Sequence, residues 1–515
     1  MAGVDRNSLL AAAAARRPRG AAVVCGATTL DYPGLRDLAE RMGGAMAEAG
    51  AQPGDRVAAL FPNCHRYLAC YFAALDRRYV LLPLNLRLLP EEMGGLLEHG
   101  GARVVVGDPE LLALLPGKVA TAPRAEGEGW AIARLPRGAA PPEAMPEGAA
   151  HLYYTSGTTA RPKGVVLTRA NLLAHLDMTL RELALAQGDV WLHAAPMFHL
   201  ADAWAIWTVT AAAGTHVMLR RFDPQAACDL IEAAGVTLTN LVPAMIPGLL
   251  DAAARGGRRL PSLRLLMSGG APVAPRLVAR IGEILACEYA QTYGLTETSP
   301  FLTFSLLDES LRRLPPEEQL RLRARAGRPA RGVEVRLVSP PAAERFEDVP
   351  ADDATVGEVI ARGPTVTPGY FRDPEATREA FRGGWFHTGD LGTIDRRGFI
   401  NLVDRAKDVI ITGGETVYSA EVEHLLHEHE AVREVAVFGV PDDTWGEAVR
   451  AAVVLAAPAA STSEALIAFC RERMAHFKCP RGFDFVASLP RTGSGKIDKR
   501  ALREPFWRGH ARRIN

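Results

Sequence analysis

The sequence predicts an α/β protein with a large N-terminal domain built on doubly wound sheets, a small β-rich lobe and an α+β C-terminal domain. Over residues 30–108 and 171–270, short apolar runs alternate with amphipathic segments, which is the pattern of a parallel sheet covered by helices. From 332 to 403 the chain changes to short β-runs separated by Gly, Pro and Asp. A compact pattern of helix, two strands, helix and strand follows. We therefore expect a boundary at residue 405, with domains 1–404 and 405–515.

The individual elements are placed by the apolar runs and their breaks. LLAAAAA at 9–15 is expected to begin a helix and not a signal peptide, because two Arg follow it at once. Residues 110–150 are rich in Ala, Pro and Gly and are expected to form a surface connection, whereas the charged segment 307–326 is expected to be helical. The other helices are expected at 32–48, 66–75, 90–99, 171–185, 203–213, 224–234, 243–255, 419–429 and 463–474, and strands at 55–61, 79–84, 103–108, 215–220, 236–242, 263–268, 433–440, 450–456 and 483–489. Residues 190–200 are expected to form a strand that runs into a loop presenting His199.

Composition excludes several classes of protein. The 515 residues carry 59 Lys+Arg and 59 Asp+Glu, so the net charge of zero provides no global field that would recruit nucleic acid or an anionic membrane. No stretch approaches the roughly 18 consecutive apolar residues of a membrane span. The seven Cys are scattered without a C-x-x-C pair, which favours reduced thiols. We expect a cytoplasmic protein.

A hydroxyl-rich turn, YTSGTTARPKGV at 154–165, is the strongest local signal. It follows an apolar run, and its backbone N–H and side-chain O–H groups can surround one anion while Lys163 adds a positive charge. It is not a Walker A loop, because Lys163 is followed by Gly164 and not by Ser or Thr. The alternative is a solvated loop between two strands. We predict a phosphate cradle formed by Thr155, Ser156, Gly157, Thr158, Thr159 and Lys163.

Six further strings follow this turn in order: APMFHL, SGGAP, QTYGLTETS, GWFHTGDLG, DRAKDVIITGGE and PRTGSGKIDKR. The series resembles the adenylate-forming superfamily of acyl-CoA synthetases, luciferases and peptide-synthetase adenylation domains, and it spans nearly the whole chain. PLNLRLLPEEM and LLDESLRRLPPEEQLRLRARAG resemble bacterial medium- and long-chain fatty-acyl-CoA synthetases more than aryl or aminoacyl enzymes. The family normally has Gly where this chain has Ala160, and Ala tolerates a positive φ less well.

The resemblance implies a nucleotide site. In the family a carboxylate attacks the α-phosphorus of ATP, giving acyl-AMP and pyrophosphate, and a thiol then displaces AMP. Glu297 would bind Mg²⁺, with Thr155 as a second ligand, because Mg²⁺ prefers hard oxygen ligands beside the phosphates. Thr296 would bond the α-phosphate, and Asp390 the ribose hydroxyls with Arg405 nearby. The adenine slot would consist of Gly270, Ala271, Pro272, Gln291, Thr292 and Tyr293.

The resemblance also implies a mobile C-terminal domain that pivots at Lys407. In one orientation its glycine-flanked loop would bring Lys496 to the α-phosphate as the catalytic residue of adenylation. In the other, the loop of Thr412, Gly413 and Gly414 would line the thiol route of the co-substrate CoA. Trp445 would contribute to the CoA side, with core packing as the alternative.

The acyl group is indicated by fewer residues. His199 would stand between the carboxylate site and the thiol route, although a lone His is more often structural. The pocket candidates Trp204, Val242, Pro243 and Met245 carry no charge, and Asp202 is expected to repel a second carboxylate. These residues favour a hydrophobic monocarboxylic acid.

Three readings compete with an ATP-dependent acyl-CoA synthetase. The chain could be an acyl-AMP ligase that loads a carrier protein, a luciferase-like oxygenase, or a nucleotide-binding relative without catalysis. The presence of Lys496, Glu297 and Asp390 argues against the last, because a binding module does not need the mobile Lys. The resemblance also favours a homodimer.

Overall fold

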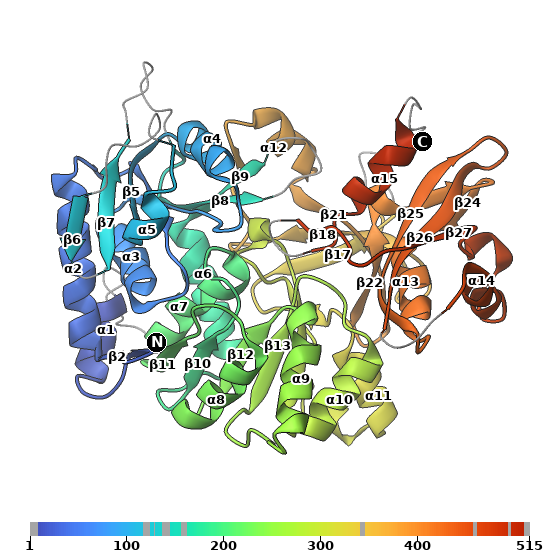
Figure 1. Ribbon diagram of the computed structural model, residues 1–515, viewed down its shortest axis with the longest axis horizontal. Coiled ribbons are helices and arrows are strands. Elements are labelled where there is room, and N and C mark those ends of the chain that lie inside the picture. The colour runs from blue at the N-terminus through green and yellow to red at the C-terminus, as the bar shows by residue number, and fades with distance from the viewer. Residues whose placement is uncertain are drawn as a thin grey trace. The chain divides into compact units, whose positions relative to one another are not determined.

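The computed structural model describes residues 9–116, 124–127, 129–135, 145–155, 162–339, 346–456, 461–492 and 496–508. The chain forms two compact units. Unit 1 comprises Met1–Glu334 and Ala361–Phe386, and unit 2 comprises Val335–Ile360 and His387–Asn515. Unit 2 therefore contains the predicted C-terminal domain together with part of the predicted β-rich lobe (Figure 1).

Unit 1 is built on two mixed sheets. The first has the order β16-β15-β14-β13-β12-β10-β11-β1-β2 and is parallel from β14 to β1, with antiparallel strands at both edges. The second has the order β19-β9-β8-β4-β3-β5-β7-β6 and is parallel from β8 to β5. Strands of the first sheet are β1 Val23–Cys25, β2 Thr28–Leu30, β10 Val190–His193, β11 Thr215–Met218, β12 Leu238–Leu241, β13 Leu265–Ser268, β14 Glu288–Tyr293, β15 Thr303–Phe304 and β16 Arg328–Pro329. Strands of the second are β3 Arg56–Leu60, β4 Val80–Pro83, β5 Ala102–Gly107, β6 Arg124–Gly127, β7 Trp130–Arg134, β8 Ala149–Thr155, β9 Lys163–Thr168 and β19 Tyr370–Phe371.

Helices cover both sheets. Leu192, Val217 and Leu266 of the first sheet pack against Ile231 and Leu249 of neighbouring helices in one hydrophobic core. These helices, α8, α9 and α10, line one side of the sheet in Figure 1. The helices of unit 1 are α1 Leu9–Arg16, α2 Tyr32–Glu48, α3 His65–Asp76, α4 Pro90–Gly100, α5 Pro109–Leu112, α6 Arg169–Glu182, α7 Leu200–Ala211, α8 Pro224–Ala234, α9 Ile246–Arg255, α10 Pro275–Leu285, α11 Pro316–Arg323 and α12 Pro374–Ala380, with short 3₁₀ turns η1 Pro243–Met245, η2 Thr296–Thr298 and η3 Leu311–Arg313.

Local chemistry fixes several of these boundaries. The Asp223 carboxylate accepts a hydrogen bond from the Ala226 N–H at the start of α8, and Pro224 occupies the first helical position. Gly235 ends α8 in the left-handed conformation, with φ of 62°. Asp31 caps α2 in the same way. Both helices have the predicted bounds.

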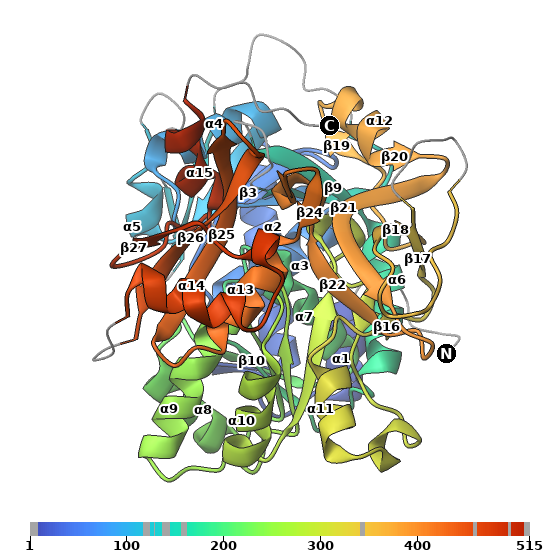
Figure 2. The ribbon, with the colours of Figure 1, turned by 90° about the vertical axis from the view of Figure 1, so that its right-hand side faces the viewer.

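Unit 2 contains most of the remaining strands and, among the described residues, three helices. Its second sheet has the order β24-β23-β26-β25, with β27 also paired to β26, and helices α13 and α14 pack on it around Val437, Val453 and Leu466 (Figure 2). β17 Glu334–Val338, β18 Gly357–Arg362, β20 Phe381–Arg382, β21 Trp385–Ile394 and β22 Ile400–Arg405 form the other sheet, to which unit 1 also contributes residues. The C-terminal elements are η4 Ala406–Asp408, β23 Ile410–Thr412, β24 Glu415–Val417, α13 Ser419–His427, β25 Val432–Asp442, β26 Gly446–Leu455, α14 Ser463–Arg471, η5 His476–Lys478, β27 Gly482–Phe485 and α15 Lys499–Trp507.

The structure corrects three expectations. Residues 110–150 are not only a surface connection, because Trp130–Arg134 pairs antiparallel with β5. The segment 307–326 is helical mainly at Pro316–Arg323. The sheets are mixed and not wholly parallel. In the part of the chain that the structure describes, no helix is long and apolar enough to cross a membrane.

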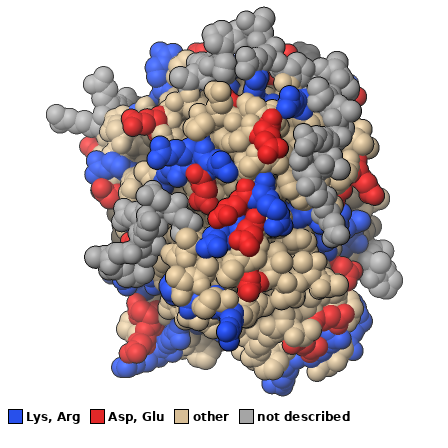
Figure 3. All heavy atoms as spheres, turned by 90° about the vertical axis from the view of Figure 1, so that its left-hand side faces the viewer, with Lys and Arg blue, Asp and Glu red and all other residues tan. Residues whose placement is uncertain are grey.

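Charges are mixed along the surface. Figure 3 shows basic and acidic atoms intermingled on the face that it draws. On α2, for example, the Arg36 guanidinium lies 3.5 Å from the Glu40 carboxylate and 3.7 Å from that of Asp37. This intermingling agrees with the net charge of zero.

Candidate functional site

The carboxyl ends of four adjacent parallel strands bring most of the predicted unit 1 residues to one edge of the first sheet. β10, β12, β13 and β14 are neighbours and all run in the same direction. β10 leads to His199, β12 to Val242, β13 to Ala271 and β14 to Glu297. Ligands of open α/β sheets bind at this edge, so the topology places the predicted nucleotide and acyl residues at the expected end.

Two strand ends form the predicted adenine slot. Gln291 on β14 lies beside Ser268 on β13, and its amide Nε2 donates a 2.9 Å hydrogen bond to the Ala271 carbonyl. The Thr292 hydroxyl donates to the Ser268 carbonyl at 3.1 Å. Gly270 has a φ of 89°, which turns the chain away from β13. The structure thus brings Ala271, Gln291 and Thr292 together, with Tyr293 buried at the end of β14.

Glu297 lies on η2, directly after Thr296. The Glu297 side chain is only 8% exposed, and its Oε1 accepts a 3.0 Å hydrogen bond from the phenol of Tyr370. The Glu297 carbonyl accepts a 2.7 Å hydrogen bond from the Thr367 N–H. Both partners come from the segment between β18 and α12, which the sequence analysis did not assign to the site. Glu297 is therefore held by hydrogen bonds to both its backbone and its side chain.

The phosphate cradle is described only at its two ends. Thr155 ends β8 and Lys163 begins β9, and the two residues face each other in the antiparallel register of these strands. The Lys163 ammonium lies 5.1 Å from the centre of the Tyr370 ring. The predicted donors between these ends, Ser156, Gly157, Thr158 and Thr159, lie outside the described residues, as does Ala160.

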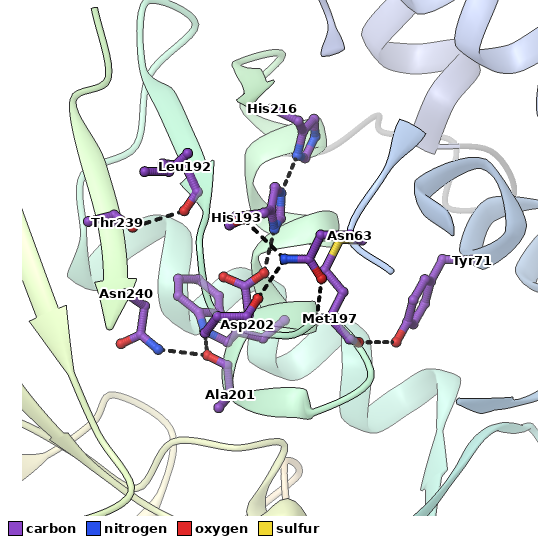
Figure 4. A network of polar contacts seen from close by, with 12 residues as sticks. Asn63, Tyr71, Leu192, His193, Met197, Ala201, Asp202, His216, Thr239 and Asn240 are labelled. Atoms are coloured by element: carbon purple, nitrogen blue, oxygen red, sulfur yellow. Dashed lines mark hydrogen bonds and ion pairs between the residues drawn. The ribbon is translucent and has the colours of Figure 1, made fainter. Parts of the chain in front are cut away.

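The loop that carries His199 is held by two buried side chains (Figure 4). The Asn63 amide donates to the carbonyls of His193 and Ala195 at 3.1 and 2.8 Å, and its Oδ1 accepts from the Met197 N–H at 2.8 Å. The Tyr71 phenol donates to the Met197 carbonyl at 2.7 Å. His199 itself is half-buried and is the N-cap residue of α7. Asn63 follows β3, more than a hundred positions earlier, so no local pattern in the sequence predicts this contact.

Asp202 does not have the predicted surroundings. It is fully buried, and its Oδ2 lies 2.6 Å from Nδ1 of His193, whose Nε2 lies 2.9 Å from Nδ1 of His216 (Figure 4). Burial raises the pKa of Asp202 and lowers the pKa of His216 well below its usual range. Because Asp202 is engaged inside the protein, the expectation that it repels a second carboxylate is wrong.

The acyl pocket candidates differ in exposure. Val242, Pro243 and Met245 are half-buried after β12. Trp204 is fully buried, with its Nε1 donating to the Ala201 carbonyl at 3.0 Å and its ring packed edge-on against Trp191. The role of these four residues in acyl binding therefore stays a prediction, and Trp204 presents no exposed surface for it in this structure.

Unit 2 pairs the two predicted ribose residues. Asp390 on β21 faces Arg405 on β22, and the guanidinium Nε lies 2.9 Å from Oδ1 of the carboxylate. The Asp390 N–H donates to the Thr388 hydroxyl at 3.1 Å. Lys407 follows on η4 and is exposed. Asp390 is buried, so the ion pair with Arg405 fixes its orientation.

The predicted CoA loop is a tight hairpin. Thr412 pairs with Glu415, and Gly413 and Gly414 between them have φ values of 61° and 83°, which glycine adopts readily. The Gly413 N–H donates to the Trp445 carbonyl at 2.8 Å, and a Cβ on Gly413 would lie 2.6 Å from the Trp445 ring. Trp445 is 45% exposed, so it is not a core residue. The structure brings the hairpin and Trp445 together.

Lys496 is exposed, and backbone hydrogen bonds join the described residues next to it. The Thr492 N–H donates to the Lys496 carbonyl at 2.8 Å, and the Asp498 N–H donates to the Pro490 carbonyl at 2.8 Å. The next lysine, Lys499, points elsewhere: its ammonium lies 2.7 Å from Glu423 and 2.6 Å from the Ser419 hydroxyl. Of the two lysines in GSGKIDK, Lys496 is therefore the one at the surface.

The ligands among the described residues fit a cation that binds together with a nucleotide. They contain no group of three or more His, Cys, Asp or Glu side chains that could hold a metal alone. Mg²⁺ in phosphate-transfer sites needs only one or two protein carboxylates besides phosphate oxygens. Glu297, buried at the sheet edge, supplies one such group. The donor set therefore fits Mg²⁺ bound together with ATP.

Comparison with known proteins identifies the family. The model of the AMP-binding enzyme family matches residues 10–371, and the model of the AMP-binding enzyme C-terminal domain matches residues 421–496. The chain belongs to the AMP-binding enzyme family. The predicted adenylate-forming superfamily, the enzyme class of AMP-forming acid–thiol ligases and the α/β fold are confirmed.

Relatives of this AMP-binding enzyme act on different acids. A feruloyl-CoA synthase of an Amycolatopsis species is 38% identical over 497 residues, covering 95% of this chain and 96% of that protein. The fatty acid–[acyl-carrier-protein] ligase ScoC of Streptomyces coeruleorubidus is 35% identical over 515 residues, covering 98% and 96%. A long-chain-fatty-acid–CoA ligase of Thermus thermophilus is 36% identical over 491 residues, covering 92% and 90%.

The solved structure of o-succinylbenzoate coenzyme A synthetase from Bacillus subtilis, in complex with ATP and magnesium ion, has a similar fold. It is 29% identical, with a TM-score of 0.79, and the match covers 97% of this chain and 99% of that one. The relatives thus share the ligase class and differ in the acid and in the acceptor.

Proposed function

We propose that this ligase is an acyl-CoA synthetase that activates a hydrophobic monocarboxylic acid, a medium- or long-chain fatty acid, with ATP and Mg²⁺ and transfers it to CoA. The first half-reaction gives acyl-AMP and pyrophosphate. In the second, the thiol of CoA displaces AMP. The observation that carries the proposal is the single sheet edge at which β10, β12, β13 and β14 bring together the candidates for the base, the metal and the acid.

The roles proposed for unit 1 follow from its geometry. Lys163, at the start of β9, neutralises phosphate charge, while the Ala271 and Gln291 strand ends receive the base. Glu297 and Thr155 would hold Mg²⁺, which when bound reduces the repulsion between the carboxylate and the triphosphate. His199, at the start of α7, orients the acid and limits access between the carboxylate and thiol sides.

The roles proposed for unit 2 concern the ribose, the thiol and the reacting phosphate. Asp390, fixed by Arg405, accepts hydrogen bonds from the ribose hydroxyls. Lys496 stabilises the charge that builds as the carboxylate approaches the α-phosphate. The hairpin at Gly413 and Gly414, with Trp445 against it, provides the CoA side, and rotation at Lys407 exchanges the two arrangements.

Support for a fatty acid comes from apolar residues and from relatives. Val242, Pro243 and Met245 follow β12 and carry no charge that would receive a second carboxylate. Two relatives, whose matches cover at least 90% of this chain, have names that state a fatty acid as the substrate. The feruloyl-CoA synthase at 38% identity makes an aromatic acid the first competitor. ScoC makes a carrier protein the alternative acceptor, with transfer from the same acyl-AMP.

A panel of acids tests the proposal. Octanoate, dodecanoate, hexadecanoate, ferulate and o-succinylbenzoate are each incubated with enzyme, ATP and Mg²⁺, with and without CoA, and pyrophosphate and acyl-CoA are measured. We expect kcat/KM for the best fatty acid to exceed that for ferulate by at least about tenfold, since each buried methylene contributes about 0.8 kcal/mol.

Each rival has a distinct result. Ferulate above every fatty acid would contradict the substrate proposal. Pyrophosphate release that leaves acyl-AMP unconsumed by CoA would favour the carrier-protein ligase. A protein that binds ATP but releases no pyrophosphate with any acid would favour the non-catalytic alternative.

A further inference from the structure

Tyr370 connects two parts of the site that the chain supplies from distant segments. Its phenol donates a 3.0 Å hydrogen bond to Oε1 of Glu297, which lies on η2 after the first sheet. Its ring lies 5.1 Å from the ammonium of Lys163, which begins β9 of the second sheet. One side chain therefore touches both the candidate metal ligand and the described cation of the phosphate cradle.

The backbone around Tyr370 fixes this position from both sides. Tyr370 pairs with Val165 in the antiparallel register of β19 and β9, and the Val166 N–H donates to the Gly369 carbonyl at 3.2 Å. On the other side, the Thr367 N–H donates to the Glu297 carbonyl at 2.7 Å. Residues 365–371 therefore form a bridge between the two sheets, and Tyr370 is held on it.

Two further contacts make the bridge rigid. The Thr367 hydroxyl donates to the Val166 carbonyl, and the Ser299 hydroxyl donates to the Thr365 carbonyl at 2.6 Å. Thr367 and Ser299 are both buried, with exposed fractions of 2% and 1%. These hydrogen bonds are buried, so water does not compete with them. The bridge therefore sets the position of Glu297 relative to β9.

The phenol can act only as a donor to Glu297. An ionised carboxylate only accepts hydrogen bonds, so the phenol O–H is the donor in this 3.0 Å contact. A carboxylate that accepts this hydrogen bond through one oxygen has a fixed orientation and retains acceptor capacity for a cation.

We propose that Tyr370 is a positioning residue: its hydroxyl orients Glu297 toward the Mg²⁺ of bound ATP, while its ring holds Lys163 at the phosphate cradle. This inference rests on the proposed function, in which Glu297 serves as the Mg²⁺ ligand. Ligating carboxylates are commonly oriented by a hydrogen bond of this kind, and its loss reduces metal affinity by about 10- to 100-fold. The ring contact contributes separately as a cation–π interaction.

Tyr370→Phe separates the two roles, because it removes the hydroxyl and keeps the ring. ATP binding is measured by isothermal titration calorimetry in buffer with Mg²⁺ and in buffer with EDTA. The readout is the Mg²⁺ effect, defined as the Kd in EDTA divided by the Kd in Mg²⁺. We expect the Mg²⁺ effect of Tyr370→Phe to fall about tenfold from that of the wild type. The affinity in EDTA is expected to change less than about twofold because the ring remains over Lys163.

Tyr32→Phe is the matched control. Like Tyr370, Tyr32 donates a phenol hydrogen bond inside the protein, at 2.9 Å to the Gly214 carbonyl; Tyr32 is fully buried and Tyr370 is half-buried. A general loss of stability from removing a buried hydroxyl would affect both variants, whereas only Tyr370→Phe is expected to reduce the Mg²⁺ effect. In a Glu297→Gln background, adding Tyr370→Phe is expected to cause no further fall, because the hydroxyl acts through Glu297.

The outcomes distinguish the inference from the proposed function. If the wild type shows a Mg²⁺ effect and Tyr370→Phe shows the same ratio, the inference is overturned and the proposed function stands. An equal loss of affinity in both buffers would assign Tyr370 a structural role only and would also overturn it. If the wild type binds no ATP in either buffer, the proposed function is overturned and the inference falls with it.

Discussion

Buried histidines are the residues through which acid is expected to weaken this protein. Burial lowers the pKa of His151 and of His175 to about 3, and burial lowers the pKa of His65 to about 4. These values lie below the roughly 6.5 of an unfolded histidine. The unfolded chain therefore binds more protons below pH 6.5, and stability is fully present above that pH and is lost as the pH falls.

His175→Leu tests this sign at one residue. The His175 ring packs against Trp204 and Phe301, and its Nε2 has no hydrogen-bond partner among the described residues. Between pH 6 and pH 4, one such histidine changes the free energy of unfolding by about 1.4 kcal/mol per pH unit. The free energy of unfolding is measured by urea unfolding followed by tryptophan fluorescence. Between pH 6 and pH 4 it is expected to fall less steeply in the variant than in the wild type, by the slope that one bound proton contributes. An unchanged pH slope would contradict this assignment.

At the residue scale, sequence reasoning found side chains in recognisable strings and missed those that act through space. Glu297, Gln291 and Lys496 stand in strings whose order identified the family. Tyr370 stands apart from those strings, and its contact with Glu297 arises only when β19 pairs with β9. The expectation for Asp202 was wrong because the sequence of α7 does not show that the Asp202 carboxylate contacts His193 at the end of β10. A hydrogen bond between segments has no signal in either segment alone.

At the element scale, prediction succeeded where caps and apolar runs agree. α2 and α8 were predicted to the residue, since Asp31 and Asp223 cap them and Pro follows at the first helical turn. β7 was missed because Trp130–Arg134 is a short run inside a segment rich in Ala, Pro and Gly. Its strand character comes from pairing with β5, which is a tertiary effect.

The turn between β14 and η2 is the element on which Glu297 depends most directly. A Cβ on Gly294 would lie 1.8 Å from the Pro300 carbonyl oxygen, so even Ala forces the backbone to move. We expect Gly294→Ala to cost about 3 kcal/mol of stability and to weaken MgATP binding at least about tenfold. Thermal unfolding and calorimetry measure the two effects.

Gly282→Ala is the control for that substitution. Gly282 lies in α10, and apart from its chain neighbours and the backbone of its own helix, no atom lies within 4 Å of the position that its Cβ would take. Ala there is expected to stabilise by about 0.5 to 1 kcal/mol, because glycine is a poor residue inside a helix. Equal effects at the two positions would contradict the importance assigned to the Gly294 turn.

At the scale of the whole molecule, the two units hold different parts of one proposed reaction. Unit 1 contains Lys163, Glu297 and the strand ends for base and acid, whereas unit 2 contains Asp390 and Lys496. The matches to two family models agree with an enzyme that has a separate C-terminal domain, but the predicted domain 1–404 included Asp390, which lies in unit 2. The boundary at residue 405 stays a prediction, as does the exchange of positions at Lys407.

Lys496→Ala tests the central claim most directly, because Lys496 is assigned to adenylation alone. Both half-reactions are measured separately: pyrophosphate release from acid and ATP, and acyl-CoA formation from supplied acyl-AMP and CoA. We expect the variant to lose adenylation by at least about 100-fold, as expected when a positioned charge is removed from the transition state, and to keep thioester formation within about threefold of the wild type. Equal loss of both half-reactions, or no loss of either, would contradict the account.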